Sequence, residues 1–297
     1  MREEIARLRD AMEREAYVTD RATATAAYLA MTLQKPLLIE GHPGVGKTEV
    51  AKVLASALDV ELIRLQCYEG LDVTTALYEW NYAKQLLHIK LQEGSAASAR
   101  EREAEIFSRE FLLERPLLRA ITRADASPVL LVDEVDRSDE EFEAFLLEVL
   151  SDHQVTIPEI GTVRATHPPH VVLTSNRTRE LSEALRRRCL YLWIDYPSFE
   201  KEVRIVRAKT PGVAEQLVGE VVRFIQRVRG RRLAKTPGVA ESLDWAQALV
   251  ALGADALGGD LVDETLGCVL KDEGDIRNVR GAIAERGLGA YIADGAP

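Results

Sequence analysis

The sequence LLIEGHPGVGKT, residues 37–48, sets the expected architecture of the whole chain. Its first residues, Leu37–Ile39, have the continuous apolar character of a buried parallel strand, and Lys47 and Thr48 open a segment with helical apolar spacing. The glycines between them allow a tight turn in which backbone N–H groups converge on phosphate oxygens without interference from a Cβ. Strand, glycine-rich turn and helix in this order predict a site for a nucleoside triphosphate.

The residues expected to hold the nucleotide lie in this turn and at the start of the helix. The helix N-terminus contributes its positive dipole end. Lys47 provides a charge for the β- and γ-phosphates, and Thr48 provides a hydroxyl ligand for Mg²⁺. We expect the loop to surround the phosphates of ATP with Gly41, His42, Pro43, Gly44, Val45, Gly46, Lys47, Thr48 and Glu49.

A second apolar strand is expected over PVLLVDE, residues 128–134, and it runs directly into two carboxylates. Continuous apolarity is typical of a central parallel strand that is covered on both faces. The carboxylates then lie at the C-terminal edge of the sheet, where such sheets bind ligands. Asp133 can bind Mg²⁺ through water, and Glu134 can orient or deprotonate the attacking water.

Two further polar groups follow at the ends of expected elements. Asn176 comes directly after the expected strand 170–174, where its amide can bond the γ-phosphate and the attacking water. The plainer interpretation is an asparagine in a strand-end turn. Arg186, Arg187 and Arg188 end a short helix. They complement the helix dipole, contact a nucleic-acid phosphate, or supply an arginine finger to a neighbouring subunit, which is the interpretation we favour.

Composition is that of a soluble globular protein. The 297 residues are 46% hydrophobic and 29% charged, and the formal net charge is -10. This sign argues against a general affinity for nucleic acid or anionic membranes. The N-terminus has no apolar signal core, and no apolar run reaches membrane-spanning length. Three widely spaced cysteines without C-x-x-C spacing indicate reduced thiols and a cytoplasmic location.

The expected fold is α/β, a P-loop NTPase αβα sandwich with a parallel sheet over residues 1–197, followed by a smaller all-helical lid over 198–297. Tyr196 and Pro197 mark the boundary. Residues 138–141 (SDEE) predict a capping box, and 72–94 predict a helix with an insertion that packs or grips something. Residues 94–99 predict a surface turn. The remaining expected elements are helices 2–16, 20–33, 100–122 (broken near Pro116) and 181–187, a strand 61–66, a hairpin 154–157/162–166, and a buried strand 189–195.

This set of motifs resembles the AAA+ ATPases and, within them, the MoxR family. The resemblance covers roughly residues 21–271. It is most specific in LIRLQCYEGLD (62–72), LYEWNYAKQLLHIKL (77–91), EEFEAFLLEVLSDHQVTIPEIGTVRA (140–165) and LTSNRTREL (173–181), which look like the CoxD-like branch linked to maturation of carbon monoxide dehydrogenase and related molybdenum hydroxylases.

The resemblance implies ring hexamers, an insertion in the second core helix, and a hairpin before the sensor strand. It also implies a chaperone-like remodeller that works on a metalloenzyme client with a von Willebrand factor A domain partner. By position, Lys47 and Thr48 bind phosphate and Mg²⁺, and Asp133 and Glu134 serve hydrolysis. Asn176 is the first sensor, and Arg188 or Arg187 is the finger.

One departure from the family concerns the lid. Many AAA+ lids carry an arginine at the start of a late helix, whereas residues 241–253 (ESLDWAQALVALG) contain no basic residue. Arg231, Arg232 or Lys235 substitutes for it, or the contact is absent. Two alternatives to the remodeller remain: a nucleic-acid motor or loader, and a nucleotide-gated assembly switch with little turnover.

Overall fold

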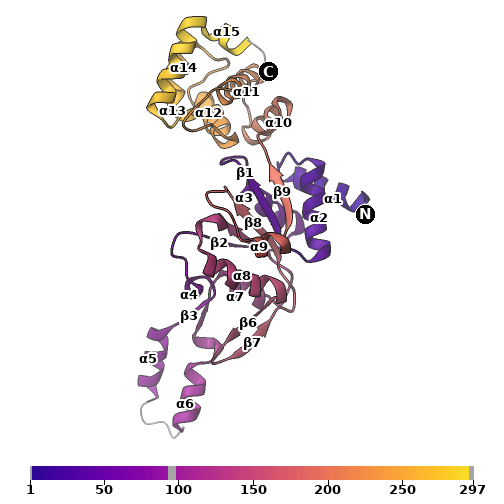
Figure 1. Cartoon of the computed structure of the whole chain (residues 1–297), viewed down its shortest axis with the longest axis vertical. Helices are drawn as coiled ribbons and strands as arrows, with labels where there is room; N and C mark the ends of the chain where they lie inside the picture. Colours follow the sequence, from indigo (N-terminus) through magenta and orange to yellow (C-terminus); the bar gives the residue numbers. More distant parts are fainter. Residues whose placement is uncertain (1, 93–97, 294–297) are drawn as a thin grey trace. The chain divides into compact units, whose positions relative to one another are not determined.

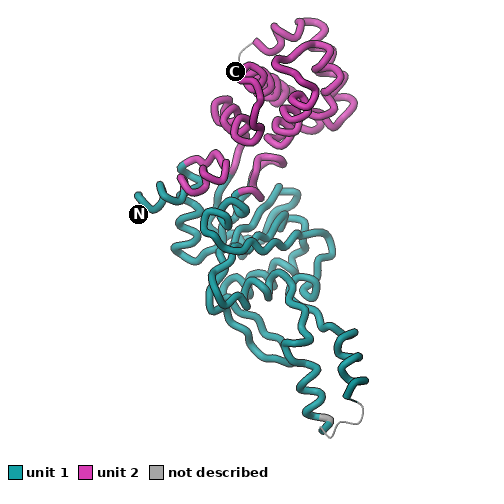
Figure 2. Tube along the Cα trace, turned by 180° about the vertical axis from the view of Figure 1, so that it is seen from behind, with its two compact units in different colours: residues 1–8, 21–40, 50–193 teal, residues 9–20, 41–49, 194–297 magenta. Residues whose placement is uncertain are grey.

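The computed structural model describes residues 2–92 and 98–293 (Figure 1). The chain forms two compact units (Figure 2). Unit 1 contains residues 1–8, 21–40 and 50–193, and unit 2 contains residues 9–20, 41–49 and 194–297. The residues 94–97 of the expected surface turn lie outside the described part of the chain.

A five-stranded parallel sheet forms the centre of unit 1, as the sequence predicts. Its order is β2-β5-β8-β1-β9. The register pairs Leu62 of β2 with Val129 of β5, and Leu131 of β5 with Val172 of β8. Consecutive strands are not neighbours here, so the carboxyl ends of β5 and β8 meet although a hairpin and a helix separate them in sequence. The strands are β1 (Leu37–Gly41), β2 (Leu62–Gln66), β5 (Val129–Asp133), β8 (His170–Ser175) and β9 (Leu190–Ile194).

Burial along the strands follows their position in the sheet. All five residues of β1 and all five of β5 are buried, in agreement with their continuous apolar sequence. The expectation of a buried strand over 189–195 is wrong for half of its side chains. Because β9 is the edge strand, Tyr191 is 54% exposed and Trp193 is 37% exposed.

The helices that pack with the sheet begin where the sequence pattern predicts. Leu117, Leu118 and Ile121 of α7 join the apolar core formed by β2, β5 and α8. The bounds are α1 (Arg2–Arg14), α2 (Arg21–Leu33), α3 (Lys47–Leu58), α7 (Pro116–Thr122), α8 (Glu140–Asp152) and α9 (Glu183–Arg188).

The start of α8 differs from the expected capping box. The N-cap is Asp139, whose carboxylate accepts a hydrogen bond from the backbone N–H of Phe142. The Ser138 hydroxyl instead donates to the carbonyl of Val135, which closes the 3₁₀ turn Val135–Arg137. Aspartate is as good an N-cap as serine, and that turn leaves Ser138 one residue before the cap.

The segment after β2 contains two short strands that the sequence pattern does not reveal. The expected helix 100–122 is wrong in its middle. There, α6 (Ala99–Ile106) ends, a 3₁₀ turn (Arg109–Phe111) follows, and β4 (Leu112–Glu114) pairs with β3 (Tyr78–Trp80). Helices α4 (Val73–Ala76) and α5 (Tyr82–Leu91) lie on either side of β3, and α5 and α6 form a helical pair (Figure 1).

The predicted hairpin is confirmed. Strands β6 (Gln154–Ile157) and β7 (Gly161–Arg164) pair antiparallel, with Val155 opposite Val163. Both valines and Ile157 are buried in the core of unit 1, so the alternating pattern presents its apolar face to that core.

The C-terminal part of unit 2 is helical and packs around α11. Seven residues of this helix are buried in a core that also contains Trp245 of α12 and Tyr291 of α15. The bounds are α10 (Phe199–Lys209), α11 (Glu215–Arg229), α12 (Val239–Ala251), α13 (Gly259–Val269), α14 (Glu273–Arg286) and α15 (Leu288–Ala293). No helix in the described part of the chain is long and apolar enough to cross a membrane.

Candidate active site

The glycine-rich loop has the backbone conformation that a phosphate-binding turn needs. Gly44 and Gly46 have φ angles of +73° and +92°, which a residue with a side chain rarely adopts. A Cβ on Gly41 would lie 2.1 Å from the carbonyl oxygen of Ile194, so only glycine fits there. A Cβ on Gly46 would meet nothing within 4 Å, and the loop is therefore open at this point.

The side chains of the loop are held within unit 2. The Lys47 ammonium donates to the carbonyls of Gly41 and His42, at 2.9 and 2.8 Å. His42 stacks on Tyr196, with ring centroids 4.5 Å apart, and Glu49 pairs with Lys209 at 2.9 Å. Pro43 and Gly44 pass close to Gly238, which precedes α12. Lys47 and Thr48 are the first two residues of α3, so the hydroxyl of Thr48 starts from the helix N-terminus.

The loop is bonded to the lid helix α12 through backbone groups. The N–H groups of Val239 and Ala240 donate to the carbonyl of Gly44, at 2.9 and 3.1 Å. The Glu241 side chain closes the helix start by accepting from the Gly238 N–H. This contact uses no arginine.

The three basic residues proposed as substitutes for the lid arginine lie between α11 and α12. Arg231 donates to Asn278 of α14, while Arg232 and Lys235 have exposed side chains. The N–H of Lys235 donates to the Asp275 carboxylate, which fixes this connection to α14. None of the three takes part in the printed bonds between Gly44 and α12.

Asp133 is buried, and both of its oxygens have hydrogen-bond donors. Oδ1 accepts from the Thr174 hydroxyl at 2.5 Å. Oδ2 accepts from Arg64 of β2 through Nη2 at 2.6 Å and Nε at 3.1 Å. Because Asp133 is only 4% exposed, this arginine provides a counter-charge for a carboxylate that water hardly reaches.

Glu134 is held in an uncommon backbone conformation beside a group of donors. Its φ and ψ are 55° and 49°, a left-handed conformation that costs roughly 1–3 kcal/mol for a residue other than glycine. Oε1 accepts from the Asn176 amide at 3.3 Å. Oε2 accepts from the Gln66 amide and from Arg137, both at 3.2 Å. The carboxylate therefore faces the amide that the sequence marks as a sensor.

The loop that carries Asn176 is fixed by a buried aspartate. Asp136 accepts from the N–H groups of Asn176 and Thr178, at 3.2 and 2.8 Å, and from the Thr178 hydroxyl at 2.7 Å. Arg177 between them has a φ of +58°. The loop after β8 is thus tied to the turn after β5, which keeps the sensor amide beside the carboxylates.

The three arginines at the end of α9 have different surroundings. Arg186 makes a forked contact with Glu40, a buried carboxylate on β1, at 2.9 and 3.0 Å. Arg187 is 75% exposed and pairs with Glu183. Arg188 donates to the Ser151 hydroxyl and the Ala184 carbonyl, which are both neutral. Within the described residues, only Arg188 of the three has no carboxylate within 4 Å.

Several residues of this site escape sequence reasoning. Arg64 and Gln66 reach Asp133 and Glu134 because β2 lies beside β5, and nothing within β2 indicates that neighbour. Glu40 does leave a signal, since a carboxylate inside an otherwise apolar strand needs a buried cation or donor. Arg186 and the Tyr191 hydroxyl fulfil that need.

The residues present fit a magnesium nucleotide. The loop offers backbone N–H groups at a helix start and a lysine, which suit phosphate. Magnesium prefers oxygen ligands and commonly takes one or two from the protein, with the rest from phosphate and water. Thr48 and Asp133 would supply such oxygens, and the ion would neutralise charge on the phosphates. Glu134, an acceptor for three donors, is suited to orient a water molecule or to accept its proton.

The parallel sheet, the phosphate loop after β1 and the carboxylates at the end of β5 define a P-loop nucleoside triphosphatase of the AAA+ type. The sequence profile described as "AAA domain (dynein-related subfamily)" matches residues 36–189, which is more than half of the chain. The chain belongs to this family.

Relatives and solved structures agree with this class. An uncharacterized protein of Staphylococcus epidermidis is 24% identical over 217 residues, covering 71% of this chain and 74% of its own. One of Staphylococcus haemolyticus is 22% identical over 240 residues, covering 79% and 82%. Two variants of Thermotoga maritima RuvB share the fold. Both have a TM-score of 0.51, with 19% and 18% identity, over 89% and 93% of this chain and 74% and 82% of theirs.

Proposed function

We propose that this AAA+ protein hydrolyses ATP in a Mg²⁺-dependent reaction, with Glu134 as the base that activates water. The observation that carries this proposal is the contact between the Glu134 carboxylate and the Asn176 amide at 3.3 Å. A carboxylate next to a neutral amide can accept the proton of a water molecule that the amide orients. Arg137 and Gln66 hold the same carboxylate, so it is positioned before substrate arrives.

The proposal includes a ring of subunits, probed through the arginines of α9. Glu40 already neutralises Arg186, and Arg187 pairs with Glu183. Arg188 bonds only neutral oxygens among the described residues, so its charge is available to a phosphate of a neighbouring subunit. An arginine supplied in this way accelerates phosphoryl transfer by roughly 10³–10⁵. We assign the finger to Arg188, with Arg187 as the second choice, and we expect a hexamer.

The client is proposed from the resemblance to MoxR proteins of the CoxD-like branch. On this basis the ring acts as a chaperone-like remodeller in the maturation of a metalloenzyme such as carbon monoxide dehydrogenase, together with a von Willebrand factor A domain protein in the cytoplasm. The helical pair α5–α6 and the hairpin β6–β7 support this proposal, because both lie where the resemblance implies insertions.

The test of hydrolysis is the variant Glu134→Gln. It keeps the size and hydrogen-bonding capacity of the side chain but removes the base. We expect turnover to fall by about 10²–10⁴ while nucleotide affinity stays within a factor of about three. Lys47→Ala should abolish nucleotide binding, and Glu79→Gln on β3 is the matched control. If Glu134→Gln retained full turnover, Glu134 would not be the base.

The test of the shared site is a mixing experiment. Arg188→Ala and Lys47→Ala proteins, each inactive alone, should recover part of the activity when mixed, because some interfaces then contain one intact site. No recovery in mixtures that still form oligomers would exclude a finger in trans. Arg187→Ala in the same experiment decides between the two arginines.

The client is tested by what remains bound to the Glu134→Gln protein in ATP. The proposal requires a von Willebrand factor A protein or a molybdenum enzyme subunit in that complex, and neither in the Lys47→Ala sample. Stimulation of turnover by added DNA would instead favour a nucleic-acid motor.

A further inference from the structure

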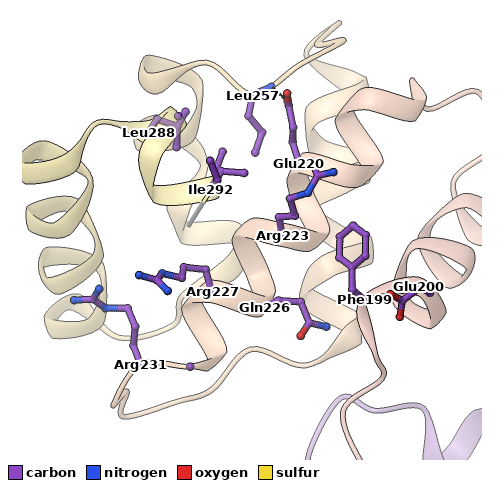
Figure 3. A pocket seen from close by; sticks show the side chains of 13 residues that line it. Phe199, Glu200, Glu220, Arg223, Gln226, Arg227, Arg231, Leu257, Leu288 and Ile292 are labelled. Carbon is purple, nitrogen blue, oxygen red and sulfur yellow. Dashed lines mark hydrogen bonds between the residues drawn. The ribbon is translucent and has the colours of Figure 1, made fainter. Parts of the chain in front are cut away.

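The helical part of unit 2 contains a large pocket between α11 and α15 (Figure 3). Its volume is about 920 Å³. Arg223, Arg227 and Arg231 follow one another along one wall, and the aliphatic side chains of Leu257, Leu288 and Ile292 line the other side. None of the phosphate-loop residues lines this pocket, so it is a second site.

The arginines of the pocket lack carboxylate partners. The guanidinium of Arg223 lies over the ring of Phe199 at 5.4 Å, and that of Arg227 lies over the ring of Tyr291 at 6.0 Å. Among the residues that the structure describes, no carboxylate oxygen lies within 4 Å of either guanidinium. Arg227 is half-buried. A partly desolvated cation whose contact is an aromatic face gains more from an anion than a solvated one does.

The carboxylates near the pocket contribute little to balancing this charge. Glu220 accepts from the backbone N–H of Leu257 at 2.7 Å and from the Gln216 amide at 2.9 Å. Glu220 is thereby committed to fixing the loop before α13. Arg231 bonds the neutral Asn278 side chain. The pocket therefore combines a row of cations with an aliphatic wall.

We propose that this pocket binds an acidic, aliphatic segment of a partner protein in helical conformation. The three arginines are four residues apart, so their Cα atoms rise by about 6 Å per step along α11. Glutamates four residues apart on a partner helix have the same spacing, and leucines between them would contact the aliphatic wall. The proposal concerns a docking site and does not depend on ATP hydrolysis.

Protein is a better occupant than nucleic acid. Phosphates would match the arginines, but the aliphatic side chains of Leu257, Leu288 and Ile292 offer nothing to a sugar-phosphate backbone. The rim also contains Glu200 and Glu220, which repel phosphate, and the chain as a whole has a net charge of -10. A peptide that alternates acidic and aliphatic groups satisfies both walls.

The experiment uses the full chain without nucleotide and a fluorescein-labelled peptide, ELLEELLEELLE, in fluorescence anisotropy. We expect saturable binding that weakens between 50 and 200 mM salt. Arg227→Glu should weaken it at least tenfold, and Arg227→Lys should weaken it less. Arg277→Ala is the matched control, since that lid arginine is 71% exposed and lies outside the pocket. Thermal unfolding followed by circular dichroism verifies that each variant is folded.

Three results would overturn the proposal. The first is equal binding of the peptide by the wild type and a folded Arg227→Glu variant, or no saturable binding at all. The second is equal binding of a control peptide with lysine in place of glutamate. The third is tighter binding of a labelled 12-nucleotide DNA strand that Arg227→Glu abolishes, or self-association that this variant abolishes without peptide binding. The last two results would assign the pocket to nucleic acid or to a second copy of the chain.

Discussion

Replacing Arg64 by methionine tests whether this arginine competes with the metal for Asp133. Methionine keeps much of the side-chain length and apolar contact but removes both hydrogen bonds to Oδ2. Arg64 is 49% exposed and Asp133 is 4% exposed, so the pair lies between a surface and a buried ion pair. Surface pairs contribute up to about 1 kcal/mol, and breaking a buried pair costs about 3–5 kcal/mol. Because half of the guanidinium is solvated, we expect a loss of about 1 kcal/mol.

The same free energy should reappear in metal binding. Asp133 can accept a divalent cation at Oδ2 only when Arg64 releases that oxygen, so the wild type loses the ion pair on binding and the variant does not. A difference of about 1 kcal/mol corresponds to roughly fivefold tighter metal binding by Arg64→Met. The assay is electron paramagnetic resonance titration of free Mn²⁺ with a non-hydrolysable ATP analogue, beside urea unfolding of the same proteins.

Arg280→Met is the matched control, because it removes an arginine–aspartate pair whose members are 50% and 57% exposed. It should leave Mn²⁺ affinity unchanged. Weaker Mn²⁺ binding by Arg64→Met would refute the reasoning. It would mean that Arg64 holds Asp133 in the position that the metal needs.

The other predictions concern packing, burial and protonation. Gly41→Ala should lower stability by about 1–3 kcal/mol because its Cβ has no room, whereas Gly267→Ala, in an open stretch of α13, should be neutral or stabilising; thermal denaturation separates them. Glu202→Ala should destabilise unit 2 by about 3–5 kcal/mol in urea unfolding, since it leaves the guanidinium of Arg229, 7% exposed, without its carboxylate. Burial, with the nearby Asp133 carboxylate, raises the pKa of the Cys67 thiol to about 12. At pH 8 the folded protein should therefore alkylate at Cys67 far more slowly than the urea-unfolded protein, with the rate rising as pH approaches 12; mass spectrometry of the alkylated peptide measures this, and equal rates would contradict it.

Sequence reasoning predicts the sheet well because each central strand is a continuous apolar run. It fails where an element depends on a distant partner. Strands β3 and β4 contain three residues each and are stabilised by pairing with one another, so the local pattern around 112–114 resembles a helix as much as a strand. The burial of β9 likewise depends on its place at the sheet edge, which its own apolar sequence does not reveal.

The site shows the same division. A glycine-rich turn between a strand and a helix is a local feature, so the phosphate loop can be recognised from sequence. The partners of the carboxylates are not local: Arg64 and Asp133 are 69 residues apart, and Asp136 and Thr178 are 42 apart. These contacts follow from strand order. The acidic run 133–148 contains both kinds of residue, because Asp136 is buried and holds the sensor loop while Glu148 is on a surface face.

The bonds from Val239 and Ala240 to the carbonyl of Gly44 make the start of α12 a mechanical extension of the phosphate loop. Any rotation of the Gly44 peptide when the loop closes around a ligand pulls on that helix through two N–H groups. Because no side-chain charge takes part, this linkage is indifferent to ionic strength and to pH near neutrality. It also tolerates many substitutions along α12, as long as no proline removes either N–H. Its sensitivity lies in the peptide plane itself.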